Sequence, residues 1–358
     1  AGRPLELDDV QFHRLLATVW PALQKMKRRD EYYAAIRVKC FSTDVGREYL
    51  RELSIDELPG LTTPETTAIM LSLCEALGMK IHFVAPAFGF QKNMPYPDDA
   101  ALRALIERQW GVCRQFGASI GFHSGSGKSA ENYQVMGQVT GSRLEVKTSG
   151  RYTYEMGRAL FASKDPADQA LWRDWHTFTL ELAVAGSFSS DPTEREMARG
   201  FVLDALAKFS PARPSALASA KEEAVPKAGE PGEGPGRPGA GREGVFVNPT
   251  VTRSALSSLP PSPEHMFWFE YNFLFVLAAG GRADKAALGD HTAAGYRQRA
   301  RFYGISDEGR LHFAKNIASY IVFLARNTGL ASPAVCDAAG KLLGGYTSLE
   351  AMLNDVSR

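Results

Sequence analysis

Cysteine is scarce in this chain, with four residues among 358. Cys40, Cys74, Cys113 and Cys336 lie far apart and never form a Cys-x-x-Cys pair. This spacing predicts neither a disulfide framework nor a thiolate zinc site. A chain with so few cysteines suits a reducing compartment, and we therefore expect a cytoplasmic location.

Net charge is also nearly absent, because 41 Lys and Arg residues oppose 40 Asp and Glu residues, which leaves a formal charge of +1. A balanced chain creates no global field that attracts nucleic acid or an anionic membrane. We therefore expect neither of them as a partner. Any anion that binds must be held by a local site.

Long apolar runs are lacking as well. No uninterrupted apolar run reaches the roughly 18 residues that a membrane-spanning helix needs, and the N-terminal stretch AGRPLELDDV lacks the basic-then-apolar order of a signal peptide. The sequence therefore predicts no membrane segment. The chain begins with Ala and not Met, and a missing upstream segment is one explanation.

What the sequence does contain is a series of short strand-like runs separated by helical ones. The strand-like runs are ELSIDEL (52–58), KIHFVAPAF (80–88), ASIGFHS (118–124) and RLEVKTS (143–149). Strands that alternate with crossover helices indicate a parallel sheet. We therefore predict an α/β fold, preceded by a helix over about residues 8–26 that is interrupted near Pro21.

Helical patterns replace the strands beyond about residue 150. Trp172, Trp175 and His176 are typical of helix packing, and residues 211–245 are too poor in large apolar side chains to order. Apolar helical patterns return over 263–281 and 307–329. We predict four parts: a β/α-barrel part at 1–165, a helical continuation at 166–210, a disordered Pro/Gly-rich linker at 211–245 and a helical C-terminal part at 246–358.

Alternate side chains of a strand point to opposite faces, so each run can be divided into two sets. In three of the runs one set is polar or small: Glu52, Ser54 and Asp56; Ser119, Gly121 and His123; and Arg143, Glu145 and Lys147. In the run 80–88 we assign His82 and Val84 to this face, opposite Ile81, Phe83 and Ala85. An open doubly wound sheet should be apolar on both faces, whereas a barrel can keep polar groups inside its C-terminal mouth. We predict a parallel β/α (TIM-type) barrel, or the C-terminal half of one, with added C-terminal helices. A sheet with one solvated face is the alternative.

Within such a barrel, five ionisable side chains would converge on one cavity: Asp56, His82, His123, Glu145 and Lys147. Burying them is costly unless they are paired or bound to a metal. Four strands are only half of an eight-stranded barrel. Either the first fifty residues and the segment 175–190 add strands, or the chain lacks the start of its natural sequence.

The glycine-rich stretch GFHSGSGKS (121–129) ends like a phosphate-binding loop. That loop needs a glycine where this chain has Phe122, because the backbone must approach the phosphates closely. A nucleotide-binding loop is therefore the less favoured interpretation. Ser124, Ser126 and Lys128, just before a helix, predict a milder anion site for a carboxylate or phosphate.

Four sequence pieces together carry a family resemblance: ELSIDE followed by TTPE, FVAPAF, GFHSGSGK and LEVKTSG. From about Glu52 to Phe161 the chain resembles the tagaturonate (hexuronate C4) epimerase family. The resemblance implies a β/α barrel, a divalent metal ion and the interconversion of keto-hexuronates such as tagaturonate and fructuronate. Two departures point to a changed substrate or a weakened activity: Gly127 stands where the family usually has Asp, and Ala87 where a basic residue is expected.

The residue types fit that chemistry. Inverting a hydroxyl-bearing carbon in a keto acid requires proton removal, carbon–carbon cleavage or hydride abstraction, and the first two produce an enolate. A cation held by carboxylate and imidazole can polarise the neighbouring carbonyl. We assign Asp56, Glu57 and His123 as metal ligands, with His82 in reserve; Lys147 to stabilise the enolate or hold the carboxylate; Glu145 as base or as the partner of Lys147; and Ser124, Ser126, Lys128 and His82 to substrate binding.

The predicted partner is thus a small sugar acid, and self-association into a homo-oligomer stays open. A different class of function is a non-catalytic or truncated protein that binds sugar acids or other anions. A nucleotide-binding loop is the third hypothesis.

Overall fold

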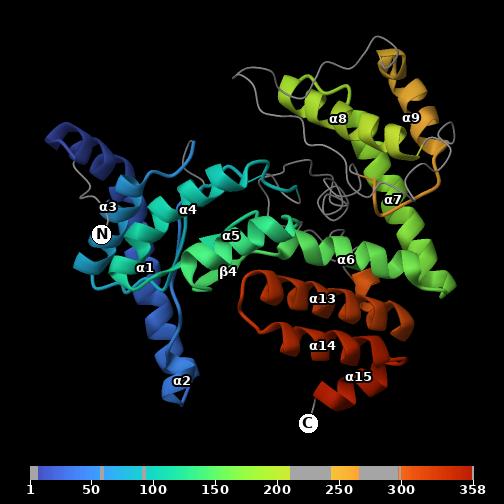
Figure 1. The fold of residues 1–358 in the computed structure, drawn as a ribbon. Helices are drawn as coiled ribbons and strands as arrows, with labels where there is room; N and C mark the ends of the chain where they lie inside the picture. The colour runs from blue at the N-terminus through green and yellow to red at the C-terminus, as the bar shows by residue number, and fades with distance from the viewer. Residues whose placement is uncertain are drawn as a thin grey trace. The chain divides into compact units, whose positions relative to one another are not determined.

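The computed structural model describes residues 7–56, 60–90, 94–209, 243–265, 297 and 300–356. The chain divides into two compact units, one made of residues 1–152 and 317–345 and the other of residues 153–316 and 346–358 (Figure 1). Nearly all of the predicted linker at 211–245, and most of the apolar pattern at 263–281, lie outside the described residues.

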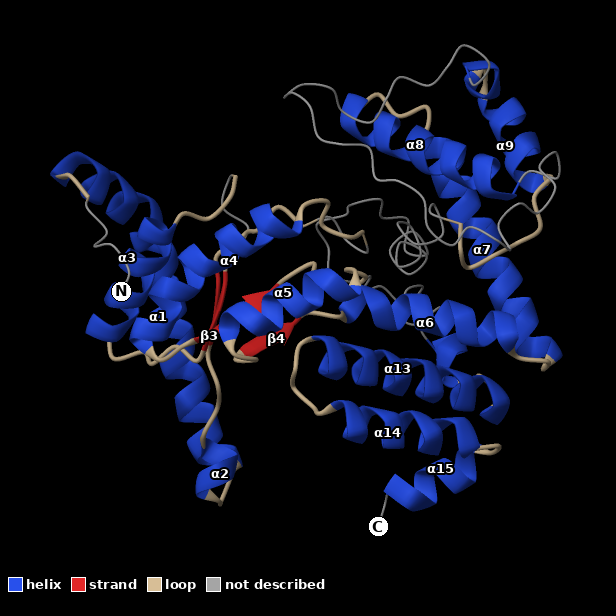
Figure 2. Ribbon diagram, viewed as in Figure 1, coloured by secondary structure: helices blue, strands red, loops and turns tan. Residues whose placement is uncertain are grey.

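The first unit contains a parallel sheet whose four strands follow one another in chain order (Figure 2). The strands are β1 (Glu52–Ser54), β2 (Phe83–Ala85), β3 (Ser119–Phe122) and β4 (Leu144–Val146). They are joined by α3 (Pro64–Ala76), α4 (Asp99–Cys113) with the short 3-10 helix η1 (Arg114–Phe116), and α5 (Ala130–Thr140). The predicted α/β class and parallel sheet are confirmed, although every strand is shorter than its sequence run.

Local sequence signals set the ends of the crossover helices. Thr63 caps α3 by accepting a hydrogen bond from a backbone N–H, and Pro64 occupies the first turn, where its missing N–H costs nothing. Asp98 and Ser129 cap α4 and α5 in the same way. Gly141 ends α5 with a φ of 59°, a conformation that suits glycine.

The helix before the sheet differs from its prediction. α1 (Asp9–Cys40) is one continuous helix of 32 residues with Pro21 inside it, so the predicted interruption was wrong. Proline removes one backbone hydrogen bond, but Val19 and Leu23, on either side of it, are buried and hold the helix against the core. α2 (Asp44–Arg47) then leads into β1.

Neither segment that we considered for additional strands forms one. The described part of the first fifty residues is helical in α1 and α2, and residues 175–190 fall largely in α7 (Pro166–Gly186). The segment TFTLELAV lies in the helix α7. A short apolar run is compatible with a helix or a strand, so its pattern could not decide between them.

One face of the sheet is apolar and covered by helices. Leu53, Val84, Ile120 and Leu144 are partners across the four strands. The first three are buried. The side chains packed around this face come from α3, α4 and α5: Ile69, Met70 and Leu71; Leu102 and Ile106; Tyr133 and Met136.

The opposite face carries the polar set, but its composition in β2 was predicted wrongly. The register pairs Phe83 with Glu52 and with Ser119, so Phe83 and Ala85 share the polar face while Val84 lies on the apolar one. Both faces of β2 bear apolar side chains, and alternation within that strand could not tell them apart.

A distant segment completes the first unit. The end of α13 (Asp307–Asn327) lies against α5 so closely that a Cβ atom at Gly137 would be 2.2 Å from the carbonyl oxygen of Thr328. Ser142 donates a hydrogen bond of 2.7 Å to the same oxygen. The hydroxyls of Tyr133 and Tyr320 are hydrogen-bonded at 2.9 Å. α14 (Pro333–Gly345) follows.

The second unit is helical in its described residues. It contains most of α6 (Ser149–Ala162), then α7, α8 (Pro192–Phe209), the 3-10 helix η2 (Glu243–Phe246), α9 (Pro249–Ser257) and α15 (Leu349–Val356). Trp172, Trp175 and His176 are buried in α7, as predicted. Buried Asp168 accepts hydrogen bonds from Ser163 and Ser306. Among the helices described, none has the length and apolar character to cross a membrane.

Candidate metal centre

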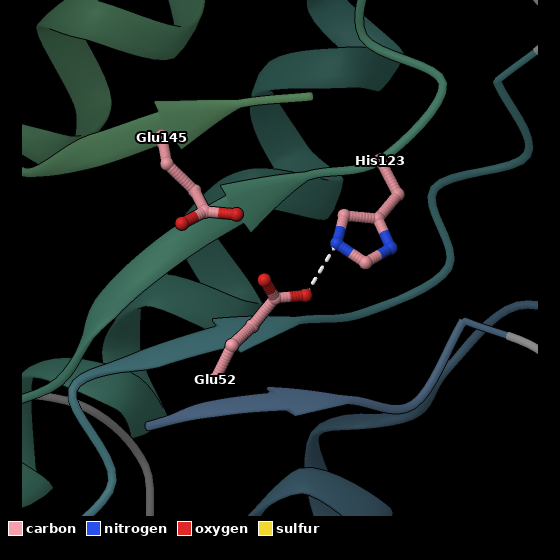
Figure 3. Close-up of side chains that lie close together, drawn as sticks. All are labelled: Glu52, His123 and Glu145. Atoms are coloured by element: carbon pink, nitrogen blue, oxygen red, sulfur yellow. Dashed lines mark ion pairs between the residues drawn. The ribbon is translucent and has the colours of Figure 1, made fainter. Parts of the chain in front are cut away.

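Three side chains with metal-binding atoms meet on the polar face of the sheet. Glu52 extends from the start of β1, Glu145 from the middle of β4, and His123 follows β3 (Figure 3). One ligand atom from each lies within 4.8 Å of the other two. This is the one group of three or more His, Cys, Asp and Glu residues with such spacing in the part of the chain that the structure describes.

The shape of the sheet brings the two carboxylates together. Neighbouring strands lie about 4.8 Å apart, so β1 and β4 would be separated by about 14 Å in a flat sheet. Side chains stand roughly perpendicular to a sheet. From the meeting of Glu52 and Glu145 we infer that the polar face is concave.

Small residues leave room for this meeting. Gly121 pairs with Glu145 in the register of β3 and β4. A Cβ atom at position 121 would lie 3.2 Å from Ala85 Cβ and 3.3 Å from Glu145 Oε1. The absence of a side chain at Gly121 therefore provides the space in which the Glu145 carboxylate lies.

His123 links the cluster to a third carboxylate, that of Asp56. Its Nδ1 atom lies 3.0 Å from Asp56 Oδ2, and its Nε2 atom lies 2.5 Å from Glu52 Oε1. The imidazole is buried, with 6% of its side chain exposed. Within the described residues no group forms a well-directed hydrogen bond to Nε2, in spite of the short distance to Glu52.

The charges in the cluster act on Glu145. Burial, and then the negative charge of Glu52, raise the pKa of Glu145 above its ordinary value of 4.5. His123 and Lys147 act in the opposite direction. Lys147 is itself exposed, and its backbone N–H bonds to Phe122 O at 3.1 Å.

The cluster fits a divalent cation. Ligand atoms at about 2.0–2.2 Å from one cation lie at most about 4.4 Å apart, so atoms within 4.8 Å of one another need only small adjustments. The negative charge of Glu52 raises the pKa of Glu145, and a cation between the two carboxylates would offset that repulsion. The buried Nε2 atom of His123, which lies beside Glu52 Oε1 without a well-directed hydrogen bond in the described residues, is the atom through which the imidazole would bind it.

The predicted anion loop uses its lysine internally. Lys128 is buried, and its Nζ atom donates to Met94 O at 2.7 Å and lies 5.1 Å from the centre of the Phe90 ring. Burial lowers the pKa of Lys128 to about 8. Ser124 is half-buried with a φ of 52°, and Ser126 is buried. The anion site at this loop stays a prediction.

One other predicted residue, His82, lies apart from the cluster. His82 precedes β2, and its Nδ1 atom accepts a hydrogen bond of 3.0 Å from the backbone N–H of Arg51, beside a cleft of about 570 Å³. Burial, together with the positive charges of Lys80 and Arg51, lowers the pKa of His82. Glu57 lies outside the described residues.

Glu52 is the member of the cluster to which we assigned no site role from the sequence, and Glu145 was predicted as base or as the partner of Lys147 and not as a ligand. It shares the polar set of ELSIDEL with Ser54 and Asp56. The alternation therefore contained the signal, but it did not say which acid of that set would meet His123 Nε2.

Part of the chain matches a known protein family. Residues 12–185 match the sequence model of the tagaturonate epimerase family. No curated protein matches the chain. The native crystal structure of the fructuronate-tagaturonate epimerase UxaE from Cohnella laeviribosi is similar, with 18% identity, a TM-score of 0.48 and coverage of 91% of this chain and 53% of its own.

The same enzyme complexed with two glycerol molecules gives 18% identity and a TM-score of 0.46, and the match covers 89% of this chain and 53% of that one. The chain thus spans about half the length of the solved structures that it matches.

Proposed function

Because residues 12–185 belong to the tagaturonate epimerase family, we propose that the chain takes part in a metal-dependent epimerisation of keto-hexuronates of the tagaturonate and fructuronate type. The observation that carries this proposal is the cluster of Glu52, His123 and Glu145, in which His123 Nε2 lies beside Glu52 Oε1 without a well-directed hydrogen bond among the described residues. The substrate is then a small sugar acid, consistent with a chain that has no strong field of its own.

Glu52, His123 and Glu145 would hold the cation. When bound, a divalent cation supplies a Lewis acid that polarises the carbonyl beside the carbon to be inverted. We propose Glu145 as a ligand, in place of the role as base or as partner of Lys147 that we assigned from the sequence, because its carboxylate belongs to the cluster. Asp56 contacts the other side of the imidazole.

The remaining groups act on the substrate's negative charge. The exposed ammonium of Lys147, whose charge already acts on Glu145, would hold the sugar-acid carboxylate or the negative charge that develops when a proton leaves carbon. Ser124 follows His123 directly, so its hydroxyl would bind a substrate oxygen at the edge of the cluster.

We further propose that the four strands form part of a TIM-type β/α barrel. Two features support this: the strands follow one another in chain order, and the polar face on which Glu52 and Glu145 meet is concave. A barrel keeps such a face inside, with its chemistry at the carboxyl ends of the strands.

The direct test is an assay with defined metals. Protein freed of metal with a chelator is supplied with Mn²⁺, Ni²⁺ or Zn²⁺ and then with tagaturonate or fructuronate, and the products are separated by chromatography. We expect conversion in both directions with at least one metal. No conversion with any of them, while calorimetry still detects uronate binding, would assign the chain to non-catalytic sugar-acid binding.

Glu145→Gln tests whether Glu145 is a ligand or a base. A ligand variant loses bound metal and activity together, whereas a variant of the base keeps its metal and loses only activity. Glu75→Gln is the matched control, because Glu75 is exposed in α3 of the same unit. It should change neither quantity.

A further inference from the structure

We propose that Asp56 is a positioning residue and not a metal ligand: it holds His123 with the proton on Nδ1, so that Nε2 is presented to the cation, and Ser54 holds Asp56. This inference rests on the proposed metal site. It replaces the role of metal ligand that we predicted for Asp56 from the sequence. The chain of contacts runs Ser54 to Asp56 to His123 to the cluster.

The first step is the location of the imidazole proton. Asp56 Oδ2 lies 3.0 Å from His123 Nδ1. An ionised carboxylate can only accept hydrogen bonds, so Nδ1 must carry the proton in this pair. In a neutral imidazole the other nitrogen then has a free electron pair. The tautomer that Asp56 selects is therefore the one that can bind a cation through Nε2.

The second step is the geometry around the ring. The two nitrogens of an imidazole point away from each other. A carboxylate that bonds to Nδ1 cannot also contact a cation on Nε2. The cluster within 4.8 Å accordingly consists of Glu52, His123 and Glu145, without Asp56.

The third step is the support of Asp56 itself. Ser54 Oγ donates a hydrogen bond of 2.7 Å to Asp56 Oδ1, so each carboxylate oxygen has one donor. Ser54 and Glu52 belong to the same face of β1, and Asp56 follows two residues later. One strand and the turn after it thus supply both a ligand and the groups that orient the histidine ligand.

The test measures cation binding and the histidine tautomer separately. Mn²⁺ alone is titrated into metal-free protein, and free Mn²⁺ is followed by electron paramagnetic resonance. Removing the partner of a metal-bound histidine typically weakens affinity by 10–100-fold. We expect a loss of about that size for Asp56→Ala, a smaller one for Asp56→Asn, whose amide oxygen still accepts from Nδ1, and the smallest for Ser54→Ala.

The tautomer is read in the absence of metal. Long-range nitrogen–proton NMR spectra of protein labelled with [¹⁵N]histidine distinguish a protonated from an unprotonated ring nitrogen, and His123→Gln identifies the signals of His123 among the seven histidines. We expect a protonated Nδ1 in the unmodified chain and in Asp56→Asn. Asp56→Ala should lose this preference.

Several outcomes would overturn the inference. If Asp56→Ala leaves both the tautomer and the Mn²⁺ affinity unchanged, Asp56 positions nothing. If Asp56→Asn loses as much affinity as His123→Ala, Asp56 is a ligand. If the unmodified chain binds no Mn²⁺, Ni²⁺ or Zn²⁺, the proposed function fails, and the tautomer of His123 in Asp56→Ala still decides whether Asp56 orients it. Glu75→Ala serves as the control for loss of a carboxylate.

Discussion

The chain buries histidines in two kinds of surroundings. His123 lies between two carboxylates, with Asp56 at one nitrogen and Glu52 near the other. His176 and His265 lie in the second unit among aromatic rings, with His176 Nε2 and His265 Nδ1 3.2 Å apart. Burial, and for His176 also the charge of His265, lowers the pKa of His176 to about 3, and burial lowers that of His265 to about 4.

The difference shows that burial alone does not make a histidine functional. In the second unit burial among aromatic rings favours the neutral imidazole of His176 and His265. The neighbours described for these two rings do not include a carboxylate that would attract a cation. In the first, negative charges surround a nitrogen that lacks a well-directed partner among the described residues. The charge around the ring, and not its depth, distinguishes a candidate ligand from a packing residue.

The largest expected effect separates the two histidines directly. His123→Ala should remove the bound divalent cation and the activity, and it should also lower the free energy of unfolding of the metal-free protein because the imidazole is buried. His176→Ala should keep the cation but lower the free energy of unfolding by about 2–3 kcal/mol, because it empties a packed site and removes the partner of His265. Elemental analysis and denaturant titration measure the two quantities. Equal metal loss in both variants would contradict the comparison.

Acid should distinguish the two surroundings next. As the pH falls below about 6.5, the unfolded chain binds protons at His176 and His265, while the folded protein does so only near pH 3 at His176 and near pH 4 at His265. Stability is therefore complete above pH 6.5 and decreases below it, by up to about 1.4 kcal/mol per pH unit for each histidine. Denaturant titrations between pH 4 and 7 should show this slope, and the double variant His176→Leu with His265→Leu should flatten it. A slope unchanged in that variant would show that other groups cause it.

A third prediction concerns the carboxylates beside His123. Glu52→Gln removes the like charge that raises the pKa of Glu145, so that pKa should fall toward its ordinary value in metal-free protein. A glutamate whose pKa is raised in the folded state makes the protein less stable as the pH rises from the unfolded-state pKa to the folded-state pKa. Glu145→Gln should therefore reduce the loss of stability above pH 4.5. Carbon-13 NMR titration of the carboxyl groups measures the first effect, and an unshifted Glu145 would show that burial alone is responsible.

The smallest effect is expected from crowding the cluster. Gly121→Ala places a methyl group 3.3 Å from Glu145 Oε1, which must move slightly. We expect a cost of about 1 kcal/mol in cation binding, or about fivefold in affinity. Gly111→Ala in α4 is the matched control, because a Cβ atom there meets nothing within 4 Å. Mn²⁺ titration that finds the two variants equal would show that the space at Gly121 is not needed.

Local patterns were sufficient to predict much of the first unit. Alternating strand and helix signals gave the parallel sheet, because caps such as Thr63 and Ser129 and apolar alternation depend on neighbouring residues. We predicted that Asp56 and His123 converge, and the two side chains are in contact. The family resemblance, noted over about residues 52–161, extends to residues 12–185.

The remainder depends on contacts that no local pattern contains. Which acid of ELSIDEL meets Nε2 of His123 depends on the register of β1 against β2 and on the curvature of the sheet. The run KIHFVAPAF is much longer than β2, so the sequence could not show that His82 precedes the strand and bonds to Arg51. The continuity of α1 through Pro21 likewise depends on burial of Val19 and Leu23 in tertiary packing.

The meeting of Glu52 and Glu145 also has a mechanical side. The two residues stand on strands separated by roughly ninety residues of chain, and an ion held by both would fasten the ends of that long loop together. A covalent cross-link around a loop of about 100 residues stabilises a fold by about 4.7 kcal/mol in the chain-entropy estimate. A reversible ion at a hundredfold excess over its dissociation constant contributes about 2.7 kcal/mol. The proposed metal would therefore act as a reversible cross-link between β1 and β4 that stabilises the curved sheet, whether or not a substrate is present.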